Sequence, residues 1–347
     1  MTAEKNYRIS GHESFPCRYT WLPKAVRGVG ENPRLFSNEE QAMVDLGVGR
    51  NMTRAIRFWA QAAGVVTPLP KNGGHSLTEF ARVLFGQDSP LPDFVHRKAV
   101  ANVGRANLQV CSTVQFNEEN GLDPFLEDIR TLWLIHWNLS TDSANPLLAW
   151  DFLLNRWQEP ELVPSKALKT LEHEAAMHED RLSPVTVQQH FETFLHTYVP
   201  TRSRKGEVQE DNLDCPLVEL ELIVKVGERE LDSAAGKREP IYAFRREEKP
   251  EITAELFVYC VNDFWQKRHG HEETLGFREI AHGHGSPGQI FKIPEEDVRT
   301  RVEALARQTD GFLIYQESAH APHVRRHGAR DQIALLREIY AVEVAHV

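Results

Sequence analysis

Apolar residues recur with helical spacing between residues 46 and 64, which predicts a helix that begins near Gly49 and runs to Ala63, where Gly64 ends it. The apolar positions follow the order i, i+3, i+4, i+7 and i+11, so they share one face of the helix. That face is expected to be buried. Its members are Met52, Ala55, Ile56, Trp59 and Ala63.

The residues just before this helix predict a second, shorter one. The segment "SNEEQAMVDLGVG" (37–49) offers Ser37 or Asn38 as an N-cap, followed by acidic residues in the first turn, where the helix dipole favours negative charge. The glycines of "GVG" end that helix. Two helices joined by such a tight turn are typical of a helix-turn-helix.

The face opposite the buried stripe is basic. Arginine side chains can pair bidentately with guanine in the major groove and also bind phosphates, so this face suits a DNA groove. An arginine face used for contact with another protein is the alternative. The residues that we expect to bind DNA here are Arg50, Asn51, Arg54, Arg57 and Gln61.

A β-hairpin is predicted directly after the basic helix. "VVTP" forms the first strand, "LPKNGG" the turn with Lys71 at its tip, and "HSL" the return strand. A further helix then begins in "SLTEFARVLFG", where Ser76 and Glu79 have the spacing of a capping box. This order predicts a winged helix-turn-helix domain in residues 1–90, with Lys71 of the wing on a phosphate.

The remainder is predicted to be largely helical, in a middle region of residues 91–165 and a C-terminal domain of residues 166–347. In the middle region, tryptophans are spaced to pack in a core, and we interpret His136 as a core histidine. In the C-terminal domain, a helix that starts near Pro294 precedes "FLIYQES…PHVRR", which predicts a second wing that carries Arg325 and Arg326. The expected fold is therefore mainly α, with an N-terminal winged helix-turn-helix, small β-hairpin wings and a C-terminal winged-helix-like region.

Composition adds one fact that changes this picture. The 347 residues carry a net charge of -10, yet no acidic residue occurs from Leu46 to Thr78. A second acid-free stretch, from Phe94 to Asn117, contains Arg97 and Lys98, which we also expect to bind DNA, as we do Arg325 and Arg326. Because a polyanion responds to the local field and not to the total charge, double-stranded DNA is the expected partner.

Other classes of protein are not supported by the sequence. No run approaches the roughly 20 apolar residues of a membrane helix, and the polar start "MTAEKNYRISGHE" lacks a signal-peptide core, so we expect a cytoplasmic protein. The four cysteines form no CxxC pair, which excludes a local zinc knuckle. Motifs for ATP hydrolysis and serine catalysis are absent from the sequence.

Five segments together resemble a known family: "GHESFPCRYTWLPKA", "LGVGRNMTRAIRFW", "TLWLIHW", "EDNLDCPLVELELI" and "SPGQIFKI". They are similar to the SspB-type DNA nicking proteins of the bacterial single-strand phosphorothioation (Ssp) modification and phage defence systems, over nearly the whole chain. The resemblance implies an endonuclease that nicks DNA so that sulfur can be installed. It also implies partners, namely a cysteine desulfurase, an adenylating sulfurtransferase and an ATPase, and Mg²⁺ or Mn²⁺ as the metal.

Metal-assisted cleavage of a phosphodiester needs carboxylates that hold the cation and a group that activates water. "GHES" supplies His12 and Glu13, and the acidic segment after residue 209 supplies Asp211 and Asp214. We take these four as candidate catalytic residues. The structural alternatives are that Glu13 pairs with Arg18 or caps a helix, and that the acidic segment is a solvated turn.

Two further patterns are weaker. Glu247 and Lys249 have the Glu-x-Lys spacing of many nucleases, and His282 and His284 could form a metal pair on a strand, although nearby glycines favour a loop. Two functions outside nicking stay open: a DNA-binding adaptor or transcriptional regulator that recruits the sulfur machinery, and a scaffold for protein interactions.

Overall fold

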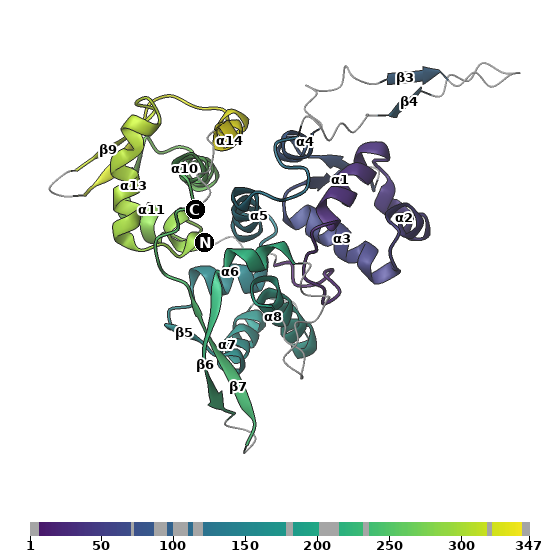
Figure 1. Cartoon of the computed structure of the whole chain (residues 1–347), viewed down its shortest axis with the longest axis horizontal. Coiled ribbons are helices and arrows are strands. Elements are labelled where there is room, and N and C mark those ends of the chain that lie inside the picture. Colours follow the sequence, from purple (N-terminus) through teal and green to yellow (C-terminus); the bar gives the residue numbers. More distant parts are fainter. Residues whose placement is uncertain are drawn as a thin grey trace, which may run out of the picture. The chain divides into compact units, whose positions relative to one another are not determined.

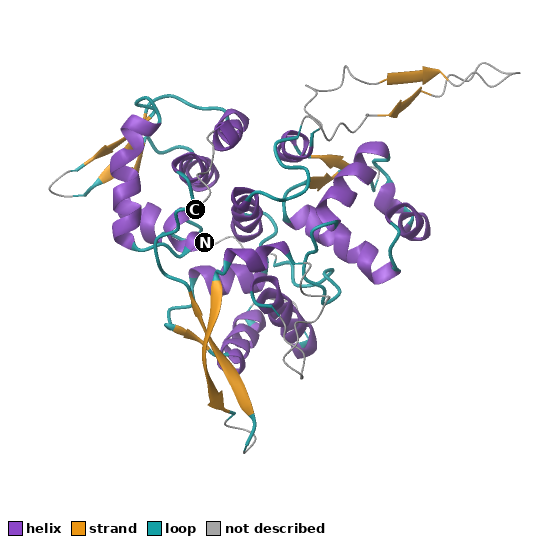
Figure 2. Cartoon of the chain, in the orientation of Figure 1, coloured by secondary structure: helices purple, strands orange, loops and turns teal. Residues whose placement is uncertain are grey.

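The computed structural model describes residues 7–70, 73–86, 121–177, 183–200, 215–231, 236–317 and 321–341, and the backbone of 96–99 and 110–113. Helices predominate, and the strands form antiparallel pairs or three-stranded sheets (Figure 2). This confirms the predicted mainly α fold with small β-hairpins. No helix in these ranges has the length and apolar character needed to cross a membrane.

Contacts along the chain group the residues into two compact units. The smaller unit is residues 11–127, and the larger unit combines residues 1–10 with residues 128–347. The division into residues 1–90, 91–165 and 166–347 stays a prediction. The helices of the predicted middle region lie within the larger unit.

The smaller unit is built from short helices and two hairpins (Figure 1). Its elements are α1 (Trp21–Glu31), η1 (Leu35–Ser37), α2 (Glu39–Leu46), α3 (Arg50–Ala62), β1 (Val66–Pro68), β2 (His75–Leu77), α4 (Glu79–Phe85), β3 (His96–Ala99) and β4 (Val110–Thr113).

The bounds of α2 and α3 follow from local chemistry that the sequence predicted. The Asn38 side chain accepts a hydrogen bond from the backbone N–H of Gln41, which makes Asn38 the N-cap of α2. Gly47 then adopts a left-handed φ of 66° and ends α2, and Gly49 stands before α3.

The buried stripe of α3 is confirmed except at its first position. Ala55, Ile56, Trp59 and Ala63 are fully buried, whereas Met52 is half-buried. The indole Nε1 of Trp59 donates to the backbone oxygen of Phe15 at 2.9 Å, so the polar atom of this large side chain is satisfied inside the unit. The α3 helix contacts α1, α2 and β1.

The predicted hairpin is present, with Val66 paired to Leu77 and Pro68 to His75. The predicted capping box of the next helix is wrong. Ser76 lies within β2, and Thr78 caps α4 by accepting the backbone N–H of Ala81 at 3.1 Å. Strand pairing holds the Ser76 backbone extended, so the first residue able to cap the helix is the one that follows the strand.

The larger unit contains the remaining elements. They are α5 (Ile129–Thr141), α6 (Leu148–Asn155), β5 (Glu161–Leu162), α7 (Pro164–Ala176), α8 (Pro184–Tyr198), η4 (Pro216–Leu220), β6 (Ile223–Glu230), β7 (Arg238–Phe244), α10 (Ala254–His269), β8 (Thr274–Gly276), α11 (Phe277–His282), α12 (Pro287–Phe291), α13 (Glu295–Gln308), β9 (Leu313–Gln316), β10 (His323–Arg326) and α14 (Gln332–Ala341).

The core of the larger unit is rich in tryptophan, as predicted, and encloses His136. Its ring nitrogens lie 2.7 Å from the Tyr198 hydroxyl and 3.1 Å from the Ile290 carbonyl oxygen. Burial lowers the pKa of His136 to about 4, which keeps the imidazole neutral. The interpretation of His136 as a core histidine is confirmed. The tryptophans that are buried in this core include Trp133, Trp137, Trp150 and Trp157.

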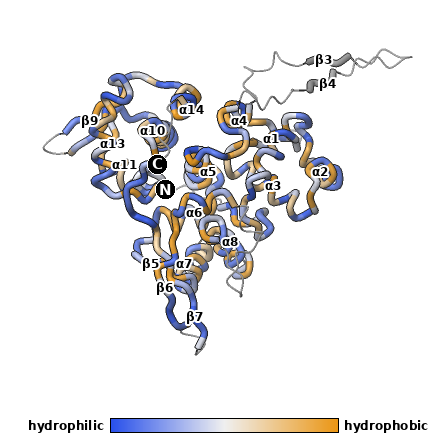
Figure 3. The backbone as a smooth tube through the Cα atoms, viewed as in Figure 1, coloured by the Kyte–Doolittle hydropathy of each residue, from blue (hydrophilic) through white to orange (hydrophobic). Residues whose placement is uncertain are grey.

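Two sheets complete the larger unit. The strands β5, β7 and β6 form one, in that order, and the paired β6 and β7 form a ribbon whose far end is hydrophilic (Figure 3). The strands β8, β10 and β9 form the other. The predicted hairpin with Arg325 and Arg326 is therefore present as β9–β10. The α13 helix buries Val298, Val302 and Leu305.

Candidate nucleic-acid interface

The α3 helix carries five of the residues predicted to bind DNA, and three of these are exposed. Arg50, Asn51 and Arg57 are exposed, and Arg54 and Gln61 are half-buried. The helix itself contains no acidic residue. The polar face of α3 is thus where the sequence placed it.

The surface around these arginines does contain a carboxylate, however. Glu39, in the first turn of α2, binds Arg54 through two contacts, at 2.5 Å between Oε1 and Nε and 3.3 Å between Oε2 and Nη2. Its Oε2 also lies 3.3 Å from Nε of Arg50. The hydrogen bond from Arg54 holds the pKa of Glu39 below its usual value, and the same bond raises the pKa of Arg54. A stretch that is free of acids in sequence is therefore not free of them in space.

Arg57 is in a different state from Arg50 and Arg54. Its side chain is exposed, and within the part of the chain that the structure describes, no residue forms an ion pair or hydrogen bond with its guanidinium group. Arg57 is therefore a cation of α3 available to a ligand without breaking a contact among the described residues.

Gln61 connects α3 to the hairpin. Its Nε2 lies 2.8 Å from Nε2 of His75 in β2, and since the amide nitrogen can only donate, the imidazole accepts. Burial, and to a smaller extent the charge of Arg57, lowers the pKa of His75 and so favours this neutral acceptor. DNA binding by Gln61 stays a prediction, and it would require the amide to leave His75.

The "GHES" loop lies against α3. The ring of His12 is buried and meets that of Phe58 edge-on, with 5.3 Å between centroids, and its Nδ1 accepts the backbone N–H of Ser14 at 3.0 Å. A Cβ atom at Gly11 would lie 3.2 Å from a ring carbon of Phe58. The loop is thus fixed closely on the helix by glycine and histidine.

The backbone of this loop is strained. Glu13 and Ser14 have φ values of 51° and 63°, a left-handed region that costs side-chain-bearing residues of order 1–3 kcal/mol each. Such strain is often stored at functional sites. The half-exposed Glu13 is near enough for its charge to raise the pKa of Arg54. A predicted catalytic carboxylate therefore lies within electrostatic range of a predicted DNA-binding arginine.

The two residues of the predicted His12–Glu13 pair differ in access. His12 anchors the loop from a buried position, whereas the carboxylate of Glu13 reaches the surface. The neighbouring arginine charge disfavours a cation at Glu13. Among the described residues, no group of three His, Cys, Asp or Glu side chains is arranged to hold a metal ion. His12 and Glu13 by themselves do not form a site for the implied Mg²⁺ or Mn²⁺, and the other two candidate carboxylates lie outside the described residues, so we derive no step through a metal.

Several predicted site residues cannot be placed. Lys71, Asp211 and Asp214 lie outside the described residues. Arg97 and Lys98 belong to β3, where they pair in register with Ser112 and Cys111 of β4, and their side chains also lie outside the described part. Their predicted roles stay predictions.

The hairpin of the larger unit presents its two arginines differently. Arg325 is exposed, whereas the guanidinium group of Arg326 lies 5.0 Å from the centroid of the Trp265 ring and donates to the Gly270 oxygen at 3.3 Å. Both line a polar cavity of about 340 Å³ that also contains Glu272 and Glu273. Carboxylates beside the arginines make this surface less cationic than the sequence indicated.

The two weaker motifs have structural roles. Lys249 is fully buried and donates to the backbone oxygens of Arg245 and Glu247, at 2.7 and 3.2 Å, and burial lowers its pKa to about 8. His282 binds Glu295 at 2.8 Å and His284 binds Asp151 at 3.0 Å. Because each histidine has its own carboxylate, the two do not form the metal pair that a strand would have produced.

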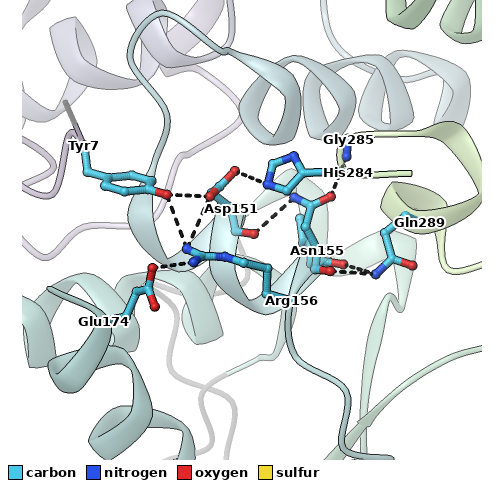
Figure 4. Close-up of polar contacts among 9 residues, drawn as sticks. Tyr7, Asp151, Asn155, Arg156, Glu174, His284, Gly285 and Gln289 are labelled. Atoms are coloured by element: carbon cyan, nitrogen blue, oxygen red, sulfur yellow. Dashed lines mark hydrogen bonds and ion pairs between the residues drawn. The ribbon is translucent and has the colours of Figure 1, made fainter. Parts of the chain in front are cut away.

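Asp151 is a buried residue that the sequence reasoning missed. One of its oxygens accepts the hydroxyl of Tyr7 at 2.7 Å, and the other lies near His284 (Figure 4). Arg156 lies close to the same carboxylate and also binds Glu174 of α7. The pKa of Tyr7 is raised, first by burial and then by Asp151.

This cluster joins segments of the larger unit that are far apart in sequence. Asn155, one turn after Asp151, accepts the backbone N–H of Gly285 at 2.7 Å, which fixes the loop after α11 on α6 (Figure 4). The only signal in the sequence was a single charged residue inside the apolar run "NPLLAWDFLLN". Since its carboxylate oxygens are engaged by these groups, we interpret the cluster as a structural tie.

Comparison with solved structures gives two matches over the chain. A crystal structure described as "SspB crystal structure" has a TM-score of 0.74 and 21% identity, and covers 98% of this chain and 90% of its own. A magnesium ion-bound SspB crystal structure has a TM-score of 0.72 and 21% identity, and covers 97% and 91%. The chain therefore has the fold of these structures, which confirms the predicted resemblance at the level of the fold.

Sequence comparison gives the family. No curated protein matches the sequence. The family described as "Protein of unknown function (DUF4007)" matches residues 9–101 and 98–340, which together make up most of the chain. The chain belongs to the DUF4007 family.

Proposed function

We propose that the smaller unit binds double-stranded DNA as a winged helix-turn-helix, with α3 as the recognition helix and the β1–β2 hairpin as the wing. The observation that carries this proposal is the acid-free helix α3, on which Arg57 and Asn51 are exposed beside Arg50 and Arg54. Exposed arginines on one helix face can bind phosphates and base edges together. In this proposal the β1–β2 hairpin continues the contact along the DNA backbone.

DNA nicking for phosphorothioate modification and phage defence is the specific activity that we propose. It is supported by the fold shared with SspB and by the strained loop that contains Glu13, whose charge acts on Arg54. In this proposal the arginines position a DNA phosphate, and Glu13 is a catalytic carboxylate in the cleavage of that strand. A cysteine desulfurase, a sulfurtransferase and an ATPase would then use the nicked DNA.

A DNA-binding adaptor that recruits the sulfur machinery without cutting DNA is the second candidate. The burial of His12 favours it, since a general base or metal ligand must reach the reacting group and this ring instead supports the loop. The adaptor and the nickase share the DNA-binding surface and differ only in chemistry.

A plasmid assay separates the two candidates. Pure protein is incubated with supercoiled plasmid and Mg²⁺ or Mn²⁺, and we expect open-circle DNA that does not form when EDTA is present. Glu13→Gln should abolish nicking and keep DNA binding, whereas Glu40→Gln, an exposed change of the same charge on α2, should leave nicking intact. A mobility shift without any open circle would favour the adaptor, and nicking by Glu13→Gln at the normal rate would remove Glu13 from the site.

A further inference from the structure

Glu39 contacts the arginines of α3 in the way that a nucleic-acid phosphate would. Its two oxygens face Nε and Nη2 of Arg54, a side-on bidentate pairing, and one of them also faces Nε of Arg50. Guanidinium groups bind carboxylate and phosphate with the same planar fork of donors. The donors that Glu39 uses are therefore among those that DNA would use.

The pairing is open to exchange because it lies at the surface. The side chains of Arg50, Arg54 and Glu39 are 56%, 41% and 35% exposed. Ion pairs between such exposed groups contribute little to stability, so a ligand can replace one partner at small cost. The low pKa of Glu39 also means that the residue keeps its negative charge at neutral pH.

Arg57 supplies the point from which an exchange can begin. It lies on the same face of α3 and is not paired with any residue in the described part of the chain. A phosphate can bind Arg57 first, and the next phosphate along the backbone then competes with Glu39 for Arg54. Until that competitor arrives, Glu39 keeps its contacts with Arg50 and Arg54.

We propose that Glu39 is an internal competitor of DNA, which occupies the phosphate position on Arg50 and Arg54 and lowers the affinity of α3 for duplexes that do not contact the rest of the surface. This inference rests on the proposed DNA-binding function. Glu39 is thereby a residue that determines specificity: weak, purely ionic contacts do not displace it, whereas a duplex that is also held by Arg57 and Asn51 does.

The test is the affinity of Glu39→Gln for a random-sequence duplex of about 25 base pairs, measured by fluorescence anisotropy on the full chain at about 100 mM salt. Removing the competing charge should tighten binding about three- to tenfold. The matched control is Glu40→Gln, which removes the same charge from the neighbouring exposed position and should change the affinity less than about twofold.

The outcomes distinguish this proposal from the proposed function. Suppose that Arg57→Glu loses DNA binding, as the proposed function requires. If Glu39→Gln then binds DNA no more tightly than the unchanged protein, the competitor role is overturned. If Arg57→Glu binds normally, the proposed DNA face is wrong and this inference fails with it. An equal gain in DNA affinity for Glu40→Gln would show a general charge effect, and this result also overturns the competitor role.

A second measurement uses the protein without any change at Glu39. The Arg54 side-chain Nε–H signal in an NMR spectrum should shift when duplex DNA saturates the protein, since its acceptor changes from carboxylate to phosphate. An Arg54 signal that stays unchanged at saturation overturns the proposal. This readout is informative even if Glu39→Gln does not fold.

Discussion

Two regions of this molecule have the same order of elements and opposite charge. In the smaller unit, α3 follows a tight turn and precedes the β1–β2 hairpin. In the larger unit, α13 follows the short helix α12 and precedes the β9–β10 hairpin. The first turn of α3 contains no acid, whereas that of α13 contains Glu295, Glu296 and Asp297.

Two of the three arginines of α13 pair with carboxylates of the same helix, and the third, Arg307, is exposed. Arg301 binds Asp297 at 3.0 Å and also donates to backbone oxygens, and Arg299 lies 3.6 Å from Glu295. Both pairs have the i,i+4 spacing that stabilises a helix. On α3, by contrast, the carboxylate comes from another helix, and Arg57 has none among the described residues. The order of elements alone therefore does not identify a DNA-binding helix; α3 differs from α13 in carrying arginines and no acidic residue of its own.

The largest effect is expected for charge reversal on α3. Arg54→Glu plus Arg57→Glu should weaken duplex binding by at least about 100-fold at about 100 mM salt, because reversed charges face phosphates. The matched control reverses two exposed arginines of the larger unit, Arg278→Glu plus Arg307→Glu, and should change the affinity less than about threefold. Circular dichroism checks the fold. An equal loss of affinity in both double variants would show that DNA binding does not distinguish the two units.

A stability effect follows from the buried histidine of the larger unit. His136 has a pKa of about 4 in the folded chain and near 6.5 when unfolded, so the unfolded state binds more protons as the pH falls between these values. Stability is complete above pH 6.5 and should drop by up to about 3 kcal/mol toward pH 4. Urea unfolding of the full chain at several pH values measures this.

His136→Gln should reduce that pH dependence while lowering stability at neutral pH, because part of the hydrogen bonding is lost. A slope that is unchanged in this variant would show that other groups, such as His196, whose pKa is also lowered by burial, carry the effect.

Two glycines with a left-handed φ, one in each unit, allow a comparison of smaller effects on stability. Gly11 has a φ of 104° and a tight approach to Phe58, whereas Gly311, after α13, has a φ of 80° and open space on the side where a Cβ would lie. Gly11→Ala should therefore cost about 1–3 kcal/mol and Gly311→Ala about 1 kcal/mol. Thermal unfolding of both variants shows which substitution lowers stability more. A smaller cost at Gly11 would mean that the "GHES" loop is not fixed on α3.

The smallest effect is expected on the β9–β10 hairpin. Arg325→Ala should weaken duplex binding about two- to threefold and lower the salt slope by about one if this arginine contacts a phosphate. Arg326→Ala should instead lower stability, since Arg326 lies on Trp265. If Arg325→Ala matched the loss on α3, the larger unit would be the main DNA-binding surface.

The sequence was most informative where local patterns decide the outcome. The apolar stripe predicted α3, and Ser37 or Asn38 with the glycines of "GVG" predicted the bounds of its neighbour, because caps and periodicity act within a few residues. The capping box was wrong because the choice between Ser76 and Thr78 depends on where the β1–β2 pairing ends. Asp151 was missed since its partners Tyr7 and His284 lie more than 100 residues away along the chain.

What the amino-acid sequence determined by itself is a helical protein with a basic, acid-free helix near its start, since helical periodicity and charge are properties of neighbouring residues. Only the tertiary structure decided which of those charges is left for a ligand. Glu39 and Arg54 are 15 positions apart and in different helices, so their contact exists only once the turn between the helices brings them together. An ion pair depends on distance in space, and distance along the chain does not give it.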